Sequence, residues 1–443
     1  LSGTKRKIIG TNIFDLTNDN DGDVIIEVTS KPTLGSSSHL VYNPKNCVIG
    51  LGCARNADPE ELWNLVESTL SDANLAKGCV AAIASIDLKA DEIAINEVAK
   101  KLNIPLLLFT ADQLEKEFDR LRYPSKLVFE EVGSHGVSEG AALACVGKKG
   151  SLIVPKNKTK SATIAISGTE NPLDRLFGRP RGRVAIVGIG PGQSSWRTPE
   201  ATQLIADSEE LVGYSLYLDL LGPLAFGKDR SDFPLGGEEE RCRYALERAG
   251  QGKKVSLICS GDAGIYAMGA LVFELLDRST ENLGVSDAAR RSEIVCTPGV
   301  SALQGAAARA GAPLGHDFCA ISLSDLLTPR EDIIRRIEAA AYGDFVIAFY
   351  NPVSLNRRTL LKGAKETLLK HRPATTPVLL AKNLGRKNET LLYRKLEDLR
   401  VDEVDMLTVV IVGSSNSKIL ELGDGSRMYT PRGYARKIDG DLA

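Results

Sequence analysis

The chain has 443 residues, which is enough for two to four domains with sizeable cores. Hydrophobic residues make up 43% of it and charged residues 25%, a balance typical of a soluble globular protein. The formal net charge of −2 creates no overall basic field, so neither nucleic acid nor an anionic membrane is an expected partner.

The sequence shows no targeting or membrane-spanning segment. No apolar run reaches the length of a transmembrane helix, and residues 1–10 lack the apolar core of a signal peptide, so we expect a cytoplasmic protein. The sequence starts without Met, and therefore the chain is either processed or a fragment of something longer.

Cysteine and histidine usage argues against disulfides and metals. The eight cysteines are scattered without a CxxC pair, which predicts reduced, mostly buried thiols. None of the four histidines is paired at the spacing of metal ligands, so no metal site is expected.

Residues 1–46 are polar and rich in turn residues, with NDNDGD at 18–23 followed by a β-like run at 23–29. We expect a small β-rich piece here, or the tail of a truncated domain.

Residues 47–167 alternate strand and helix signals, which favours an α/β domain with a mainly parallel sheet. Asp58, Pro59 and Glu61 form a helix start, with Asp58 as the N-cap. Strands are predicted at 47–52, 79–86 and 105–109 and after residue 146, and helices after residue 58 and at 91–102 and 137–146.

Residues 168–182 hold three Gly, two Pro and three Arg with no apolar period, which predicts a linker. Two further α/β units follow, at about 183–295 and 296–425, and then a polar tail at 426–443. A second capped helix start is predicted at Thr328. Strands are predicted at 183–188, 210–213, 255–259, 293–296, 344–350, 377–382 and 408–412, the 293–296 strand being placed in the later unit, and helices at 198–208, 237–249, 265–278 and 332–341.

Four short motifs follow apolar runs in this region: VGIGPG at 187–192, SGDAGIY at 260–266, TPGVSALQ at 297–304 and FYNPVS at 349–354. The glycines of the first motif suggest a dinucleotide loop. Pro191 argues against that reading because it removes a backbone donor from the turn, and no acidic residue follows a second strand at the distance a ribose requires. The structural alternative is a tight strand-to-helix turn.

Taken in this order, the motifs resemble the tetrapyrrole methylases, which use S-adenosylmethionine. SGDAGIYAMG, and above all APLGHDFCAISLSDLLTPRE at 312–331, are similar to the precorrin-3B C(17)-methyltransferase branch, over residues 183–425. The resemblance implies a two-lobed class III methyltransferase with its cofactor cleft between the lobes. It also implies a homodimer.

The resemblance also implies which residues bind the cofactor. For Asp262 and Ser301 the structural alternative is hydrogen bonding in a turn and at a helix N-cap. The residues carried over by motif are Pro191, Gly261, Asp262, Ile265, Ser301, Ala302, Asn351 and Gly385.

A tetrapyrrole with many carboxylates requires cationic donors, preferably Arg. Each candidate taken singly is more often a solvated surface charge, so the expectation applies to the group and not to any one member. Residues 238–241 are expected to be the exposed start of a helix. The candidates are Arg197, Arg330, Arg357, Arg358, Arg386 and Lys382.

Ring contraction, which this branch implies, adds a requirement for a general acid or base. His316, Asp317 and Asp325 lie in the branch-specific run and are the catalytic candidates. Their structural alternatives are a core histidine and local turn caps.

Residues 47–167 resemble the C-terminal domain of the cobalt-precorrin-5A hydrolase family, through IGLGCARNADPEEL, SIDLKADE, GVSEGAAL and LIVPKNK. Hydrolases of that family have a further upstream domain that this chain largely lacks, so hydrolysis is not a firm expectation. The polar residues of interest are Asp87, Lys89, Asp91 and Glu139, for which capping and surface charge are the favoured reading.

The sequence therefore predicts methylation of a precorrin-3 type tetrapyrrole at C17 with ring contraction, in cobalamin synthesis. Two alternatives stay open. The methylase part can belong to another branch, such as a uroporphyrinogen or diphthine methyltransferase, and the N-terminal part can be a noncatalytic carrier or scaffold for the tetrapyrrole.

Overall fold

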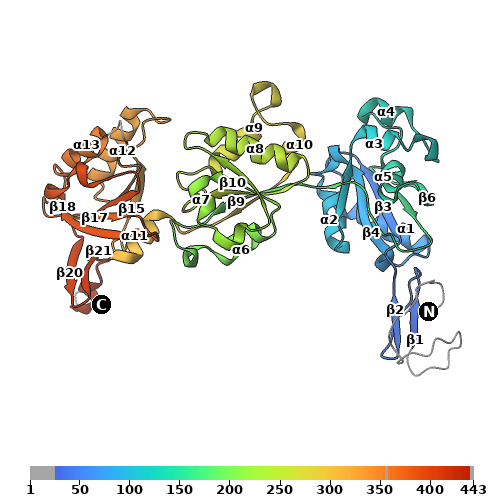
Figure 1. Cartoon of the computed structure of the whole chain (residues 1–443), viewed down its shortest axis with the longest axis horizontal. Coiled ribbons are helices and arrows are strands. Elements are labelled where there is room, and N and C mark those ends of the chain that lie inside the picture. The colour runs from blue at the N-terminus through green and yellow to red at the C-terminus, as the bar shows by residue number, and fades with distance from the viewer. Residues whose placement is uncertain (1–24, 355–357, 440–443) are drawn as a thin grey trace. The chain divides into compact units, whose positions relative to one another are not determined.

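The computed structural model describes residues 25–354 and 358–439 (Figure 1). The chain divides into two compact units, and each is described by itself. The first unit ends at Val184 and adds Leu246–Lys253 and Arg278–Glu293, and the second consists of Ala185–Ala245, Lys254–Asp277 and the chain from Ile294 onward.

The N-terminal domain is built on a six-stranded sheet of order β6-β7-β3-β4-β5-β8. The central pairs β3–β4 and β4–β5 are parallel, whereas β3–β7, β6–β7 and β5–β8 are antiparallel. The prediction of a mainly parallel sheet was therefore wrong for the outer strands, because β6 and β7 follow each other closely and pair as a hairpin. The strands are β3 (Cys47–Cys53), β4 (Val80–Ile86), β5 (Leu106–Phe109), β6 (Ser151–Lys158), β7 (Ala162–Gly168) and β8 (Arg179–Pro180).

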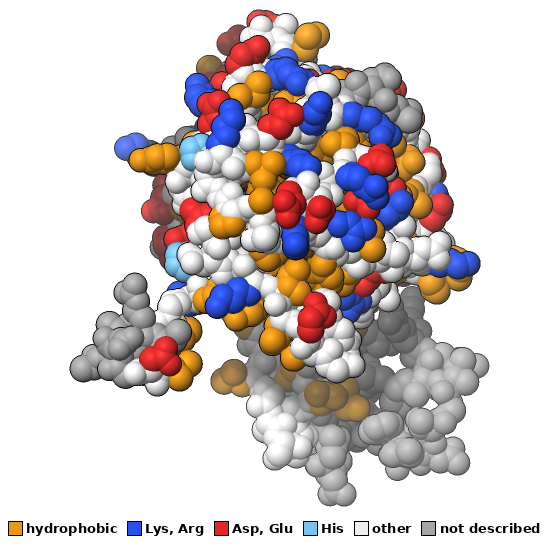
Figure 2. Space-filling model, turned by 90° about the vertical axis from the view of Figure 1, so that its left-hand side faces the viewer, with side chains coloured by type: hydrophobic (Ala, Val, Ile, Leu, Met, Phe, Trp, Pro, Cys, Tyr) orange, Lys and Arg blue, Asp and Glu red, His pale blue; other side chains and the backbone are white. Residues whose placement is uncertain are grey.

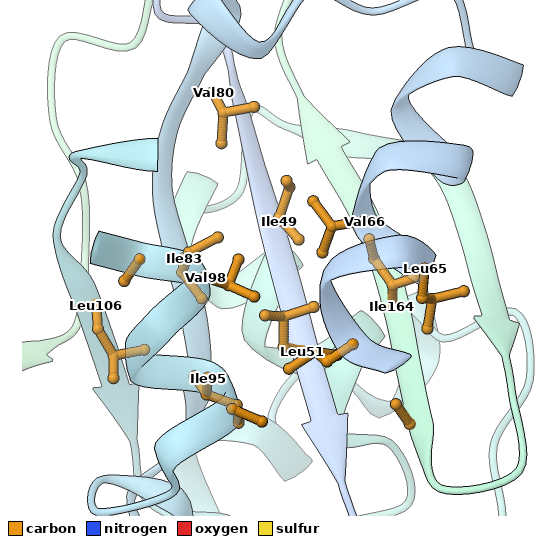
Figure 3. Packing of buried hydrophobic residues seen from close by; sticks show 14 of the residues in the cluster. Ile49, Leu51, Leu65, Val66, Val80, Ile83, Ile95, Val98, Leu106 and Ile164 are labelled. Carbon is orange, nitrogen blue, oxygen red and sulfur yellow. The ribbon is translucent and has the colours of Figure 1, made fainter. Parts of the chain in front are cut away.

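Both faces of this sheet are covered by helices. On one face α1 (Pro59–Asp72) and α2 (Ile93–Leu102) bury Leu65, Val66, Ile95 and Val98 against the strands (Figure 3). On the other face α5 (Val137–Val146) packs so closely that a Cβ on Gly50 would lie 1.9 Å from the Ser138 carbonyl oxygen. The remaining elements are β1 (Ile25–Val28), β2 (His39–Tyr42), α3 (Ala111–Glu115) and α4 (Lys126–Val132).

The start of α1 is only partly as predicted. Asp58 is the N-cap, and its carboxylate accepts from the Glu60 backbone N–H at 3.1 Å. Glu61 does not close a capping box. Its carboxylate instead accepts from the Ser161 hydroxyl at 2.6 Å, which ties α1 to the β6–β7 turn.

The first lobe of the following region has a sheet of order β11-β10-β12-β9-β13, with α6 and α8 on opposite faces (Figure 1). The strand near residue 293 was predicted for the later unit, but it pairs beside β9 in this sheet. The elements are β9 (Arg183–Gly188), α6 (Pro199–Ala206), β10 (Glu210–Tyr214), α7 (Ser215–Asp219), β11 (Asp229–Phe233), α8 (Glu238–Gly250), β12 (Lys254–Cys259), α9 (Gly269–Asp277) and β13 (Glu293–Thr297). The short helix α10 (Asp287–Arg290) belongs to the first unit.

The second lobe has a sheet of order β15-β16-β19-β17-β18, in which β15–β16 is the parallel pair. Alternation of buried residues places α12 and α13 on one face and α11 on the other. The elements are α11 (Ala302–Ala310), β15 (Phe318–Ser322), α12 (Arg330–Tyr342), β16 (Val346–Tyr350), α13 (Thr359–Leu368), β17 (Pro377–Lys382), β18 (Thr390–Lys395) and β19 (Thr408–Val412).

Two details of this lobe differ from the prediction. The helix α12 has Pro329 at its N-cap with no side-chain hydrogen bond, so Thr328 does not cap it. The strand β21 (Gly425–Tyr429) crosses the predicted start of the polar tail and joins β14 (Gly311–Ala312) and β20 (Lys418–Leu422) in a small sheet, where Met428 is fully buried. A short helix, α14 (Tyr434–Ile438), follows.

All eight cysteines are free thiols, and five of them are buried. Burial raises the pKa of Cys145, Cys242 and Cys259 to about 12, so these thiols stay protonated near neutral pH. In the described part of the chain, no helix combines the length and apolar character needed to cross a membrane.

Candidate cofactor and substrate site

The first two motifs meet backbone to backbone at the carboxyl ends of β9 and β12. The N–H of Gly190 donates to the Gly261 carbonyl at 3.1 Å, and the N–H of Gly261 donates back at 2.9 Å. A Cβ on Gly188 would lie 2.5 Å from the Gly261 carbonyl oxygen. Only glycine permits this approach, so the motif builds a tight turn.

Asp262 ties the second motif to the third. One carboxylate oxygen accepts from the Gly264 N–H and the other from the Gly299 N–H, both at 2.8 Å. Gly299 also allows close packing, because a Cβ there would lie 2.3 Å from the Gly261 carbonyl oxygen. The carboxylate can accept about four hydrogen bonds, so it has further acceptor capacity for a ligand.

The third motif leads into α11. Ser301 is the N-cap residue and is almost fully buried, and the Gln304 side chain accepts from its N–H at 2.9 Å. Ala302 is the first residue of the helix. Ser301 therefore occupies the N-cap position, but its buried hydroxyl makes no cap hydrogen bond, so the N-cap role of that side chain stays a prediction.

The fourth motif comes from the second lobe. At the end of β16 the Tyr350 hydroxyl accepts from the Leu303 N–H at 2.9 Å, which joins this motif to α11. The next residue, Asn351, has φ +48° and donates from its amide to the Ser322 hydroxyl at 3.1 Å.

A fifth segment, after β17, also reaches the first lobe. Gly385 has φ +66°, and a Cβ there would lie 2.7 Å from the Gln193 nitrogen. The Arg386 guanidinium donates to the Pro191 carbonyl at 2.9 Å and contacts the Ser260 hydroxyl at 3.4 Å. Arg386, which belongs to the second lobe, thus contacts both the first and the second motif.

A cavity of about 340 Å³ opens beside the second and third motifs, within the size range of small-molecule pockets. Its wall is mostly apolar, and Asp262 is the one predicted cofactor residue in it. It is lined by Ile186, Asp262, Ala263, Gly264, Gly269, Ala270, Phe273, Cys296, Thr297 and Pro298. Ile265 is exposed and lies in the loop before α9, which starts four residues later than predicted.

The three catalytic candidates do not lie together. His316 and Asp317 precede β15, whereas Asp325 follows it, and a five-residue strand separates its ends by roughly 16 Å. Because β15 and β16 are parallel, Asp325 lies at the same edge as Asn351, and His316 and Asp317 lie at the opposite edge. His316 accepts from the Asp317 N–H at 2.8 Å, and both side chains are more than half exposed.

The predicted cations are dispersed. Arg330 lies 3.4 Å from Asp325 and donates to the Thr359 hydroxyl at 2.8 Å, which places it beside Arg358 at the start of α13. Lys382 pairs with Asp405 at 2.6 Å. Burial lowers the pKa of Arg197, whose guanidinium donates to the Thr202 hydroxyl at 3.1 Å, and Arg357 lies outside the described residues.

On the face of the molecule seen in Figure 2, basic and acidic side chains are interspersed and form no patch of one sign. On this face a polycarboxylate would meet individually placed cations. Of the described candidates, Arg330 bonds to Thr359 at the Asp325 edge, and Arg358 is the residue that precedes Thr359.

Two residues of this region were missed or misplaced by sequence reasoning. Arg241 was expected at an exposed helix start, but its side chain is 2% exposed and pairs with Glu238 at 3.2 Å. The helical spacing of Arg241 with the buried Ala245 was a signal for this burial. Tyr266 was missed, because its left-handed backbone conformation and its hydrogen bond to the Ala320 carbonyl have no signal in the sequence.

In the N-terminal domain the polar residues of interest have structural partners. The buried Glu139 carboxylate accepts from the backbone N–H groups of Arg122, Tyr123 and Lys156 at 2.8–3.1 Å. The other three are engaged in ion pairs: Asp91 with Arg55 at 2.7 Å, Lys89 with Glu92 at 3.7 Å and Asp87 with Arg179 at 3.3 Å.

Comparison with known proteins agrees with both halves of this description. The family described as Cobalamin synthesis G C-terminus matches residues 47–167, and that described as Tetrapyrrole (Corrin/Porphyrin) Methylases matches residues 183–400. The crystal structure of the methyltransferase CobJ is 36% identical, with a TM-score of 0.52, over 56% of this chain and all of that chain.

Two curated relatives agree in their names. Precorrin-3B C(17)-methyltransferase of Sinorhizobium sp is 41% identical over 259 residues, which cover 57% of this chain and 98% of the relative. Probable cobalt-factor III C(17)-methyltransferase of Salmonella typhimurium is 43% identical over 253 residues, which cover 57% of this chain and 99% of the relative.

These relatives confirm the methylase resemblance and favour this branch over the other methylases considered, and the family match at residues 47–167 confirms the resemblance of the N-terminal part. The chain therefore belongs to the tetrapyrrole methylases, with a methyltransferase of the precorrin-3B C(17) branch preceded by a domain of the cobalamin synthesis G C-terminal family.

Proposed function

We propose that this chain transfers a methyl group from S-adenosylmethionine to C17 of a precorrin-3 type tetrapyrrole, with contraction of the ring to a precorrin-4 type product. The observation that carries the proposal is the meeting of four motifs, three from the first lobe and its edge and one from the second, in a chain that covers 98% of a 41% identical precorrin-3B C(17)-methyltransferase.

The residues present fit the cofactor. A Cβ at Gly188, Gly190 or Gly299 would lie 2.3–3.1 Å from a backbone oxygen of the protein, so these glycines let the motif loops pack closely beside Asp262. Pro191, Gly261, Asp262, Ile265, Ser301, Ala302, Asn351 and Gly385 would hold the cofactor. When bound, S-adenosylmethionine supplies an electrophilic methyl group on a sulfonium.

The protein must then position the cofactor and the substrate, exclude water and move a proton. Methyl transfer is an in-line displacement, which depends mainly on orientation in a dry cleft. Asp262 has acceptor capacity left for a ligand amine or hydroxyl. For ring contraction we assign proton transfer to Asp325 and not to His316 or Asp317, because Asp325 shares the edge of the sheet with Asn351. Arg330 and Arg358 would bind substrate carboxylates there.

For the N-terminal domain we favour the carrier or scaffold role over hydrolysis. Asp87, Lys89, Asp91 and Glu139 are all engaged by the protein itself, which leaves none poised as a free catalyst. A domain that binds the tetrapyrrole would keep the intermediate at high local concentration near the methyltransferase. We further propose a homodimer, which light scattering of the purified chain would measure.

The test is turnover by the full chain with S-adenosylmethionine carrying an isotopically labelled methyl group. Precorrin-3B and its cobalt-containing counterpart are supplied in parallel. We expect one of them to yield a ring-contracted product with a single labelled methyl group at C17, identified by mass spectrometry and NMR. Label transfer to uroporphyrinogen but to neither of these substrates would refute the assignment.

A further inference from the structure

Tyr266 adopts a backbone conformation that a bulky residue rarely takes. Its φ is +50°, in the left-handed region. Nine non-glycine residues of the described chain have positive φ, and six are Asn and one is Asp, which tolerate it. Such strain persists only where the surroundings impose it, and it concentrates at functional sites.

Contacts with the second lobe impose this conformation. The Tyr266 hydroxyl donates to the Ala320 carbonyl on β15 at 2.8 Å, and its ring lies 5.2 Å from that of Tyr350 at an interplanar angle of 50°. Burial raises the pKa of Tyr266, so the hydroxyl remains a neutral donor. The strand β15 is an edge strand, and this bond therefore uses a carbonyl that the sheet leaves available.

These contacts fix the far end of the loop that bears the second motif. Near its start, Asp262 is bound to Gly299 within the first lobe. At its other end, Tyr266 reaches the second lobe, where Tyr350 in turn accepts from the Leu303 N–H of α11. Between the two anchors lies Ile265, a predicted cofactor residue that is itself exposed.

We propose that Tyr266 is a positioning residue. By binding this loop to β15, it holds Gly261, Asp262 and Ile265 in the arrangement that binds the cofactor. The inference rests on the proposed function, because it takes S-adenosylmethionine to bind at this loop. The competing role for Tyr266 is to cover the exposed edge of β15. In that role its loss would change self-association of the chain and not its affinity for the cofactor.

The test compares Tyr266→Phe and Tyr266→Asn in the full chain. The first removes the hydrogen bond and keeps the ring, and the second relieves the backbone strain and removes both contacts. Tyr342→Phe is the matched control, because Tyr342 is 85% exposed on α12. The readouts are the Kd of S-adenosylhomocysteine by calorimetry, the KM for S-adenosylmethionine against kcat, the melting temperature and light scattering.

For Tyr266→Phe we expect the Kd and KM to rise about three- to tenfold, because one hydrogen bond is lost. The kcat at saturating cofactor and the melting temperature should stay unchanged. Tyr266→Asn should weaken binding further without lowering the melting temperature, and Tyr342→Phe should match the parent. A Kd equal to that of the parent in both Tyr266 variants, with or without a change in self-association, would refute the positioning role of Tyr266. A parent chain that fails to bind S-adenosylhomocysteine would instead overturn the proposed function.

Discussion

At the carboxyl edge of the N-terminal sheet, charged side chains neutralise one another. Arg55 pairs with Asp91 at 2.7 Å and Lys89 faces Glu92 at 3.7 Å. At the carboxyl edge of the first methyltransferase lobe, glycines instead bring main chain against main chain, as at Gly190 and Gly261. The carboxyl edges of the two α/β sheets therefore differ: charged side chains form ion pairs at one, and glycine-rich turns pack against each other at the other.

The difference has a physical origin. Charges that pair at a partly exposed edge stabilise one another and are less available as free catalytic groups. The glycine turns hydrogen-bond to each other through Gly190 and Gly261, and the Asp262 carboxylate beside them has further acceptor capacity. Each of the following changes should therefore affect one region and spare the other.

The largest effect is expected from Asp325→Asn. Loss of a general acid or base typically slows a reaction by about a hundredfold to ten-thousandfold, so ring contraction should slow by that order while cofactor affinity stays unchanged. Because His316 and Asp317 lie across β15, His316→Ala and Asp317→Asn should contract the ring at the parent rate. Single-turnover assays that follow the contracted product would show this, and equal losses in all three variants would contradict the assignment.

Next, Gly261→Trp should weaken binding of S-adenosylhomocysteine by on the order of a hundredfold, since φ is +70° there and a large side chain would block the cleft. Gly363→Trp is the matched control, because a Cβ at Gly363 in α13 meets nothing within 4 Å. Calorimetry on the full chain measures both. Undiminished affinity in the Gly261 variant would remove this loop from the cofactor site.

A smaller effect, confined to the N-terminal domain, is expected from Glu139→Gln. The substitution removes the charge from a buried carboxylate that accepts three backbone N–H groups, and the free energy of unfolding should fall by about 1.5–3 kcal/mol. The two tryptophans, Trp63 and Trp196, lie in different units, so urea unfolding of a Trp196→Phe background reports on the N-terminal domain through Trp63. If Glu139→Gln lowered methylation as well as the stability of the N-terminal domain, the N-terminal domain and the methyltransferase would not be independent.

The smallest effect is expected from cleavage between the parts. Residues 168–182 remain the predicted linker, although β8 within them pairs with β5. Limited proteolysis should cut before Arg179 and leave cofactor binding intact. If the protease cut elsewhere and left residues 168–182 intact, the predicted domain boundary would be wrong.

Much of the fold could be predicted because its strands are short, continuous apolar runs. Residues 183–188 and 377–382 were predicted with the bounds that β9 and β17 have. The polar sequence DRSDF of β11 and the half-exposed β15 gave no such signal. Because β15 was missed, His316 and Asp325 were expected in one site, whereas the strand holds them apart.

The site could be predicted as motifs but not as contacts. Glycine spacing indicated close approach at Gly188 and Gly190, which the backbone bonds confirm. Arg386 stays a predicted substrate residue, and the bond from its guanidinium to the Pro191 carbonyl of the other lobe had no signal in the sequence. Contacts between segments nearly 200 residues apart depend on how the lobes fold together, and local patterns do not carry that information.

The most direct test of this comparison is hydrogen exchange of the full chain with and without S-adenosylhomocysteine. We expect the ligand to slow exchange at residues 188–192, 260–266, 297–303, 350–351 and 384–386, and to leave residues 47–167 unchanged. Protection within 47–167, or none at the strand-end loops of the methyltransferase, would contradict the account.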